Sequence, residues 1–234
     1  MAKTKPKLSV LVDTNILIRA AMQEQERKEL QALINYSNEG KIVFNLSEIV
    51  IDEIQKQSKG LENTLDTEIA KVSKKVREIF KDTIIWNELR DLENFVVAAL
   101  YQYKGIKYEQ FLNFLEELSN IEKNKNTRVI KPDLEKFYET QRKITKGELP
   151  KINSNDIHIL DTLEEMSRKR KTETIIFVTE NKKDFFETDG SGEFIKNDKG
   201  GFIIKGLSDR NIIGFVTTKK AVSYISKEIK ENEV

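Results

Sequence analysis

The chain has 234 residues, which is enough for one large domain with a sizeable hydrophobic core. Its 40 basic and 39 acidic residues nearly cancel, so the overall charge does not indicate a nucleic-acid partner, and any such partner must be recognised by local groups. The absence of cysteine excludes disulfides and thiolate metal sites, and no apolar run is long enough to span a membrane. We therefore expect a soluble, cytoplasmic protein.

The first elements predict an α/β fold. Residues 8–12 form a short apolar run that predicts a buried strand, and the run ends at Asp13. Apolar residues at helical spacing follow as far as a stop at Gly40. Residues 41–45 predict a second strand, and Ser47 is the expected N-cap of the next helix. Strand, helix, strand and helix in this order are typical of a parallel α/β sheet.

The middle of the chain has a different character. Residues 61–126 carry many charges and place apolar residues three or four apart, with no convincing strand. We expect a helical insertion there, on a core formed by 7–60 and 127–217. Residues 1–234 would then form a single domain, which a helix over 219–231 completes.

The second half supplies the remaining strands. Residues 127–131 predict a third strand, and Asp156 opens an amphipathic helix after it. Residues 174–178 form the clearest strand of the chain. The glycine-containing stretch 188–201 predicts a flexible loop, and 211–217 predict the last strand. The expected core is a mostly parallel sheet of about five strands flanked by helices.

Acidic and amide side chains lie at the ends of these strands. Asp13 ends the first, Glu53 is on the helix after the second, Asp156 opens the helix before the fourth, and Asn181 and Asp184 follow the fourth. Because the carboxyl ends of parallel strands share one edge, we expect these side chains to converge in one cleft. Converging carboxylates raise one another's pKa unless a cation neutralises them, and Mg²⁺ or Mn²⁺ prefers oxygen ligands. Such ions activate water for phosphodiester hydrolysis.

Each of these residues also has an ordinary structural explanation. Asp13 and Asp156 are in positions where aspartate caps a helix. Glu53 could be a solvated helix residue, and Glu48 is its rival for a ligand role. Asn and Asp after residue 178 favour turns. The functional interpretation rests on all of them sharing one predicted edge.

Other polar groups near the expected cleft are less specific. His158, the only histidine, lies two residues after Asp156, where a general-base role competes with packing or a solvent-facing position. The basic run 168–171 is typical of a solvated helix end, with phosphate contact as the alternative. Lys182 and Lys183 lie closer to the expected cleft and are better candidates for phosphate contact.

Four short motifs resemble those of the PIN-domain nuclease family. Residues 12–15, Val-Asp-Thr-Asn, are similar to the first motif, with Asp13 as the metal ligand and Asn15 ordering the loop. Residues 47–54 resemble the second motif, in which the helix after the second strand carries an acid, here Glu53.

The other two motifs lie in the second half. Residues 155–160 resemble the third motif, with its acid at Asp156. Residues 178–185 resemble the fourth, whose polar positions are taken here by Thr179, Asn181 and Asp184. The resemblance covers about 1–60 and 127–217 and leaves the central helical stretch uncovered.

The resemblance implies a three-layer PIN-like fold and metal-dependent endonuclease activity, most often on RNA. It implies that Mg²⁺ or Mn²⁺ is held by Asp13, Glu53, Asp156 and Asp184. It also implies that ligands or water are oriented by Asn15, Thr179 and Asn181. An activated water would then hydrolyse the phosphodiester bond.

The sequence departs from the family pattern at Asn181, where many relatives carry an acid, so Asn181 and Asp184 compete for the fourth corner of the site. A structure-specific DNA nuclease and a catalytically weak nucleic-acid-binding module stay open as alternatives. A haloacid-dehalogenase-type phosphatase is disfavoured, because it needs an acid where Asn15 stands. We expect RNA rather than DNA as the partner and no membrane association. A homodimer and a neutralising protein partner both stay open.

Overall fold

The computed structural model describes residues 8–80, 86–146, 154–208 and 210–233. Its centre is a five-stranded, all-parallel sheet in the order β3-β2-β1-β4-β5. The strands are β1 Leu8–Val12, β2 Ile42–Ser47, β3 Thr127–Ile130, β4 Thr174–Val178 and β5 Ile212–Phe215. This confirms the predicted α/β class and the parallel sheet.

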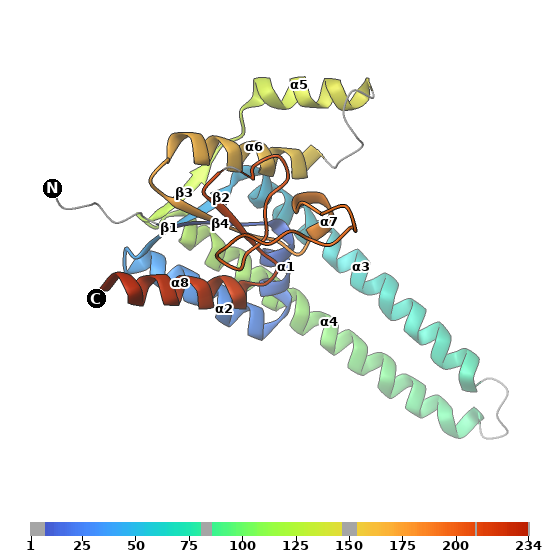
Figure 1. Ribbon diagram of the computed structural model, residues 1–234. Coiled ribbons are helices and arrows are strands. Elements are labelled where there is room, and N and C mark those ends of the chain that lie inside the picture. The colour runs from blue at the N-terminus through green and yellow to red at the C-terminus, as the bar shows by residue number, and fades with distance from the viewer. Residues whose placement is uncertain (1–7, 81–85, 147–153, 209, 234) are drawn as a thin grey trace.

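Helices cover both faces of the sheet. The helices of the core are α1 Thr14–Met22, α2 Glu24–Asn38, α5 Leu134–Thr145, α6 Ser154–Lys169, α7 Lys182–Phe185 and α8 Thr218–Glu233. Figure 1 shows α2 and α8 on one side of the sheet and α6 on the other. Every residue of β1 is buried, as expected for a central parallel strand covered on two faces.

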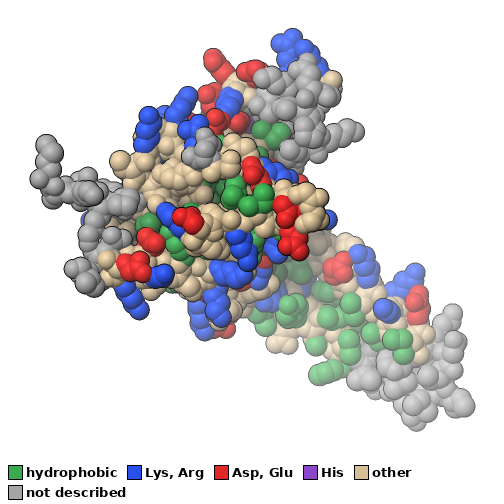
Figure 2. Space-filling model, in the orientation of Figure 1, with side chains coloured by type: hydrophobic (Ala, Val, Ile, Leu, Met, Phe, Trp, Pro, Cys, Tyr) green, Lys and Arg blue, Asp and Glu red, His purple; other side chains and the backbone are tan. Residues whose placement is uncertain are grey.

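Two long helices leave the core together. α3 Glu48–Phe80 and α4 Trp86–Glu122 pack against each other and form an arm that projects from the sheet (Figure 1). This arm corresponds to the expected helical insertion. Hydrophobic side chains gather on its surface (Figure 2). One exposed hydrophobic residue of α4 is Phe95, which is 71% exposed. In the part of the chain that the structure describes, no helix combines the length and apolarity needed to cross a membrane.

Two local predictions were wrong. The second strand, predicted over 41–45, extends as β2 to Ser47, which pairs with Ile130 of β3. Ser47 directly precedes α3, as predicted for its N-cap, but its buried Oγ makes no hydrogen bond to the helix. The helical insertion was expected to begin at 61, but the helix that carries Glu53 runs through that boundary without a break as α3, to Phe80.

The stretch predicted as a flexible loop is tied down by backbone pairing and aromatic packing. Isolated antiparallel bridges join Phe186 to Ile204 and Phe202 to Gly214. The rings of Phe186 and Phe202 stack with centroids 4.9 Å apart, and Phe194 meets both edge-on. The glycines of 188–201 indicated a loop correctly, but Phe194 within it and Phe186 and Phe202 on either side of it pack together, and Phe202 pairs with Gly214 of β5.

Candidate active site

Asp13 lies at the carboxyl end of the central strand, and its two side-chain oxygens have different partners. Oδ1 accepts a hydrogen bond of 2.7 Å from the backbone N–H of Thr14, which makes Asp13 the N-cap of α1. Oδ2 accepts bonds from Asn15 Nδ2 at 2.7 Å and from Thr179 Oγ1 at 2.6 Å. Only 5% of Asp13 is exposed. Asp13 therefore caps α1 and also lies at the edge of the sheet where the site was expected.

The contact between Asp13 and Thr179 follows from the pairing of β1 with β4. Val12 is in register with Val178, and the backbone N–H of Asp13 donates to the carbonyl of Val178 at 3.0 Å. The residues that follow the two strands consequently lie side by side. Thr179 is fully buried, and its Oγ1 also accepts the backbone N–H of Asn181 at 3.0 Å. One hydroxyl thus links Asp13 to the loop after β4.

Glu53 reaches the same edge from α3. Its Oε2 accepts a hydrogen bond of 2.7 Å from Thr14 Oγ1. This contact favours Glu53 over Glu48 as the acid of the second motif. Sequence reasoning did not single out Thr14, although its place between Asp13 and Asn15 in the first motif was a usable signal.

The remaining acids come from α6 and α7. Asp156 is in the first turn of α6, and Asn181 Nδ2 lies 3.4 Å from its Oδ2. Asp184 is in α7, directly after the loop that follows β4. The negative charges that act on Asp156 come from Asp13, Asp184 and Glu53. The structure therefore brings the four expected acids to one edge of the sheet.

The protonation of these acids reflects their crowding. Burial, and then the neighbouring carboxylates, raise the pKa of Asp156 to about 6. Burial also raises the pKa of Asp13, while hydrogen bonds from Thr179, Thr14 and Asn15 oppose the rise. Neighbouring carboxylates, and no lysine or arginine, are among the groups that shift these two pKa values.

A hard divalent cation fits this cluster by charge and by donor type, since all the acids offer carboxylate oxygens. Among the residues that the structure describes, however, no group of three or more acids or histidines is arranged so that it could hold a metal ion as it stands. The fit is therefore one of charge and chemistry and not of a closed coordination cage.

Basic residues flank the cluster on one side. Lys182 and Lys183 occupy the first turn of α7 next to Asn181, and both are exposed. Glu180 forms an ion pair with Arg19, so this acid, although in the fourth motif, has a cationic partner.

The basic run at the end of α6 was predicted as a solvated helix end, which holds only in part. Arg168 and Lys169 are exposed. Arg170 instead turns into the fold, where its Nη1 donates to Asn45 Oδ1 at 3.0 Å and to Ser9 Oγ at 3.2 Å. Arg170 therefore ties the end of α6 to the sheet.

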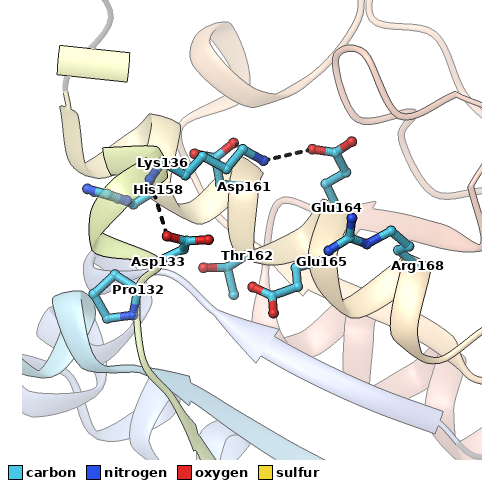
Figure 3. Close-up of a pocket in the computed structure, with 9 residues that line it drawn as sticks. All are labelled: Pro132, Asp133, Lys136, His158, Asp161, Thr162, Glu164, Glu165 and Arg168. Carbon is cyan, nitrogen blue, oxygen red and sulfur yellow. Dashed lines mark hydrogen bonds and ion pairs between the residues drawn. The ribbon is translucent and has the colours of Figure 1, made fainter. Parts of the chain in front are cut away.

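His158 is 4% exposed and lines two cavities, each of about 260 Å³. Figure 3 shows the first, between α5 and α6, with Lys136 between two acids of α6. Lys136 Nζ lies 2.8 Å from Asp161 and 3.0 Å from Glu164. The second cavity includes Glu53 and borders the acid cluster.

Comparison with known proteins assigns the chain to a family. A family model described as PIN domain matches residues 10–185, three quarters of the chain. No curated protein and no solved structure matched the chain. The matched region includes the last three residues of β1, all of β2 to β4, the arm, and every acid of the cluster.

Proposed function

This chain belongs to the PIN-domain family, whose members are generally nucleases, and from that membership we propose that it is a metal-dependent endoribonuclease. The observation that carries the proposal is the convergence of Asp13, Glu53, Asp156 and Asp184 at one sheet edge. Phosphodiester hydrolysis is chemistry for which clustered carboxylates and a divalent ion are suited. RNA is proposed over DNA because the motifs resemble those of nucleases that act most often on RNA.

PIN domains typically bind divalent metal ions, and we assign the binding of Mg²⁺ or Mn²⁺ to the four clustered acids. When bound, the ion supplies positive charge and Lewis acidity at the scissile phosphate. Asp13 is the acid whose position is most strongly fixed, since three groups donate to its carboxylate: Thr14 N, Asn15 Nδ2 and Thr179 Oγ1.

The other polar residues act by position. Asn15 and Thr179 hold the Asp13 carboxylate, and the Asn181 amide lies beside Asp156. Lys182 and Lys183 present positive charge at the rim, where they can attract the phosphates of a single-stranded RNA. We assign Asn181 an orienting role and not a ligand role, because its amide nitrogen faces the carboxylate of Asp156.

The test is the substitution Asp13→Asn. Asparagine has nearly the same shape and is also a favoured N-cap, so the fold of α1 should persist. Removing the charge should lower Mn²⁺-dependent cleavage of a labelled RNA by more than about a hundredfold, since even the supporting partners of metal ligands contribute up to that much. The matched control is Glu39→Gln, an exposed acid after α2, which should cleave at the wild-type rate.

Three outcomes would contradict parts of the proposal. Wild-type cleavage by Asp13→Asn, or undiminished cleavage in excess chelator, would remove the metal site assigned to these acids. Cleavage of a flap DNA with no cleavage of RNA would keep the site but replace the substrate.

A further inference from the structure

A cavity of about 260 Å³ opens directly beside the acid cluster. Its walls come from the first turns of α3, from Pro132 before α5, and from the start of α6. Glu53 belongs both to this cavity and to the cluster, and Asn155, another wall residue, precedes Asp156 in the chain. A group that enters the cavity would therefore lie next to the proposed site of cleavage.

The size and walls of the cavity suit one planar ring system. Pockets for drug-sized ligands measure about 300–1,000 Å³, so this cavity is too small for a larger ligand. Ile49 and Pro132 supply apolar surface, and the nearly buried His158 supplies an imidazole. Unstacked bases of single-stranded RNA pack on such surfaces, histidine included.

The polar residues of the cavity suit the rest of a nucleotide. Asp52 and Asn155 offer a carboxylate and an amide that can hydrogen-bond the edge of a base. Lys56 is exposed at the rim, where its ammonium group can meet a backbone phosphate. Apolar walls, edge-reading groups and a cation thus surround one small space.

The neighbouring cavity between α5 and α6 lacks this character. It shares Pro132 and His158 with the cavity beside Glu53, but Glu53 is not among the residues that line it (Figure 3). Its cation Lys136 is already paired with Asp161 and Glu164. Most residues that line it are charged, and it does not include Glu53 of the proposed cleavage site.

We propose that the cavity beside Glu53 binds one base of the RNA strand, next to the phosphodiester that is cleaved. This inference rests on the proposed nuclease function and adds a base-binding subsite to it. Its residues are Ile49, Asp52, Lys56, Pro132, Asn155 and His158.

The experiment combines a filled cavity with substrates that lack a base. Asp52→Phe places a ring from an exposed α3 position into the cavity, and Gln55→Phe places the same ring at an exposed α3 position outside it. RNA strands are prepared intact, or with one abasic nucleotide at each position in turn around the cleaved bond. A fully abasic strand of the same length is used for binding in excess chelator.

For the wild-type chain and for Gln55→Phe, one abasic position should slow Mn²⁺-dependent cleavage by about five- to a hundredfold, the range that follows from the energy of packing one base on a protein surface. Asp52→Phe should cleave the intact strand and that abasic strand at the same rate. This rate should equal the slow rate at which the wild-type chain cleaves the abasic strand. Binding in chelator should show the same pattern, with intact RNA preferred over the abasic strand except by Asp52→Phe.

The outcomes separate the two proposals. If RNA is cleaved but no abasic position matters, or if Asp52→Phe discriminates as the wild-type chain does, the base subsite is wrong and the nuclease function stands. If no RNA is cleaved but the binding pattern appears, the nuclease function fails while base binding in the cavity stands. If neither cleavage nor the binding pattern appears, both proposals are wrong.

Discussion

Asp13 shows why a helix cap and a site residue need not be alternatives. One carboxylate oxygen caps α1, and the other accepts bonds from Asn15 and Thr179. An aspartate N-cap contributes on the order of 1 kcal/mol, so the fold itself gains from the acid that the site uses. The sequence allowed both roles to be named but not to be combined, because the Thr179 contact joins residues 166 positions apart.

Ionisation of Asp156 lowers the stability of the folded chain. Its pKa in the folded chain is about 6, against an ordinary value of 3.8, because of burial and the three neighbouring acids. The folded state therefore holds the proton more tightly than the unfolded state does. The resulting stabilisation is complete below pH 3.8 and is lost as the pH rises through 6, so ionised Asp156 destabilises the metal-free chain above that pH.

We expect Asp156→Asn to be more stable than the wild-type chain at pH 8 in excess chelator. A shift of this size corresponds to roughly 3 kcal/mol, but Asp156 is only partly buried, and solvent screening reduces the expected gain to about 1 kcal/mol. Urea unfolding at pH 8 and at pH 4 measures it, and the gain should shrink at the lower pH. A gain of equal size in Glu39→Gln, or one that grows as the pH falls, would contradict this origin.

At the scale of elements, apolar periodicity was informative where one local pattern decides the structure. All of β1 and nearly all of β4 are buried, and their apolar runs predicted them directly. The end of β2 was predicted two residues early, at 45, because the pairing of Ser47 with Ile130 depends on a strand more than 80 residues away. Such boundaries are set by tertiary pairing, which a local pattern does not contain.

The segment after α7 illustrates a second limit. Glycines correctly marked it as a loop, but Phe186, Phe194 and Phe202 pack as one aromatic cluster over β5. This approach requires glycine in the strand, since a Cβ on Gly214 would lie 2.4 Å from Phe186 Cε1 and 2.9 Å from Ile204 Cδ1. The glycine of β5 and the phenylalanines of the loop are thus one packing unit.

We expect Gly214→Ala to destabilise the chain by about 1–3 kcal/mol, because the added methyl overpacks a closed interface. Gly190→Ala is the matched control, as its Cβ would meet nothing within 4 Å and its φ is not positive. Urea unfolding followed by far-UV circular dichroism gives both free energies of unfolding. Equal stability of the two variants would show that the loop does not pack on β5 as described.

At the scale of the whole molecule, strand order explains why the acids meet. β1 lies between β2 and β4, so the chain leaves the first strand toward one side and later returns on the other. Asp13, Glu53 and Asp184 follow these three adjacent strands, at the edge where parallel α/β folds bind ligands. Asp156 joins them because α6, which precedes β4, begins at that same edge. This convergence was predictable from topology, whereas the cavity beside Glu53 depends on how the side chains of α3 and α6 face each other.

A divalent ion that binds the acid cluster should raise the thermal stability of the whole chain. An ion that binds only the folded chain stabilises it by about 2.7 kcal/mol at a hundred times its Kd, which for a chain of this length raises Tm by about 5–10 °C. We expect Mn²⁺ to raise the Tm at pH 8 and to raise it less at pH 5, because protons then compete for Asp156. Calorimetry at constant ionic strength measures both shifts, and Asp13→Asn is the control in which the pH 8 shift should be lost. An equal shift in that variant would place the ion elsewhere on the chain, since Asp13 directly follows the central strand β1 and its charge acts on Asp156.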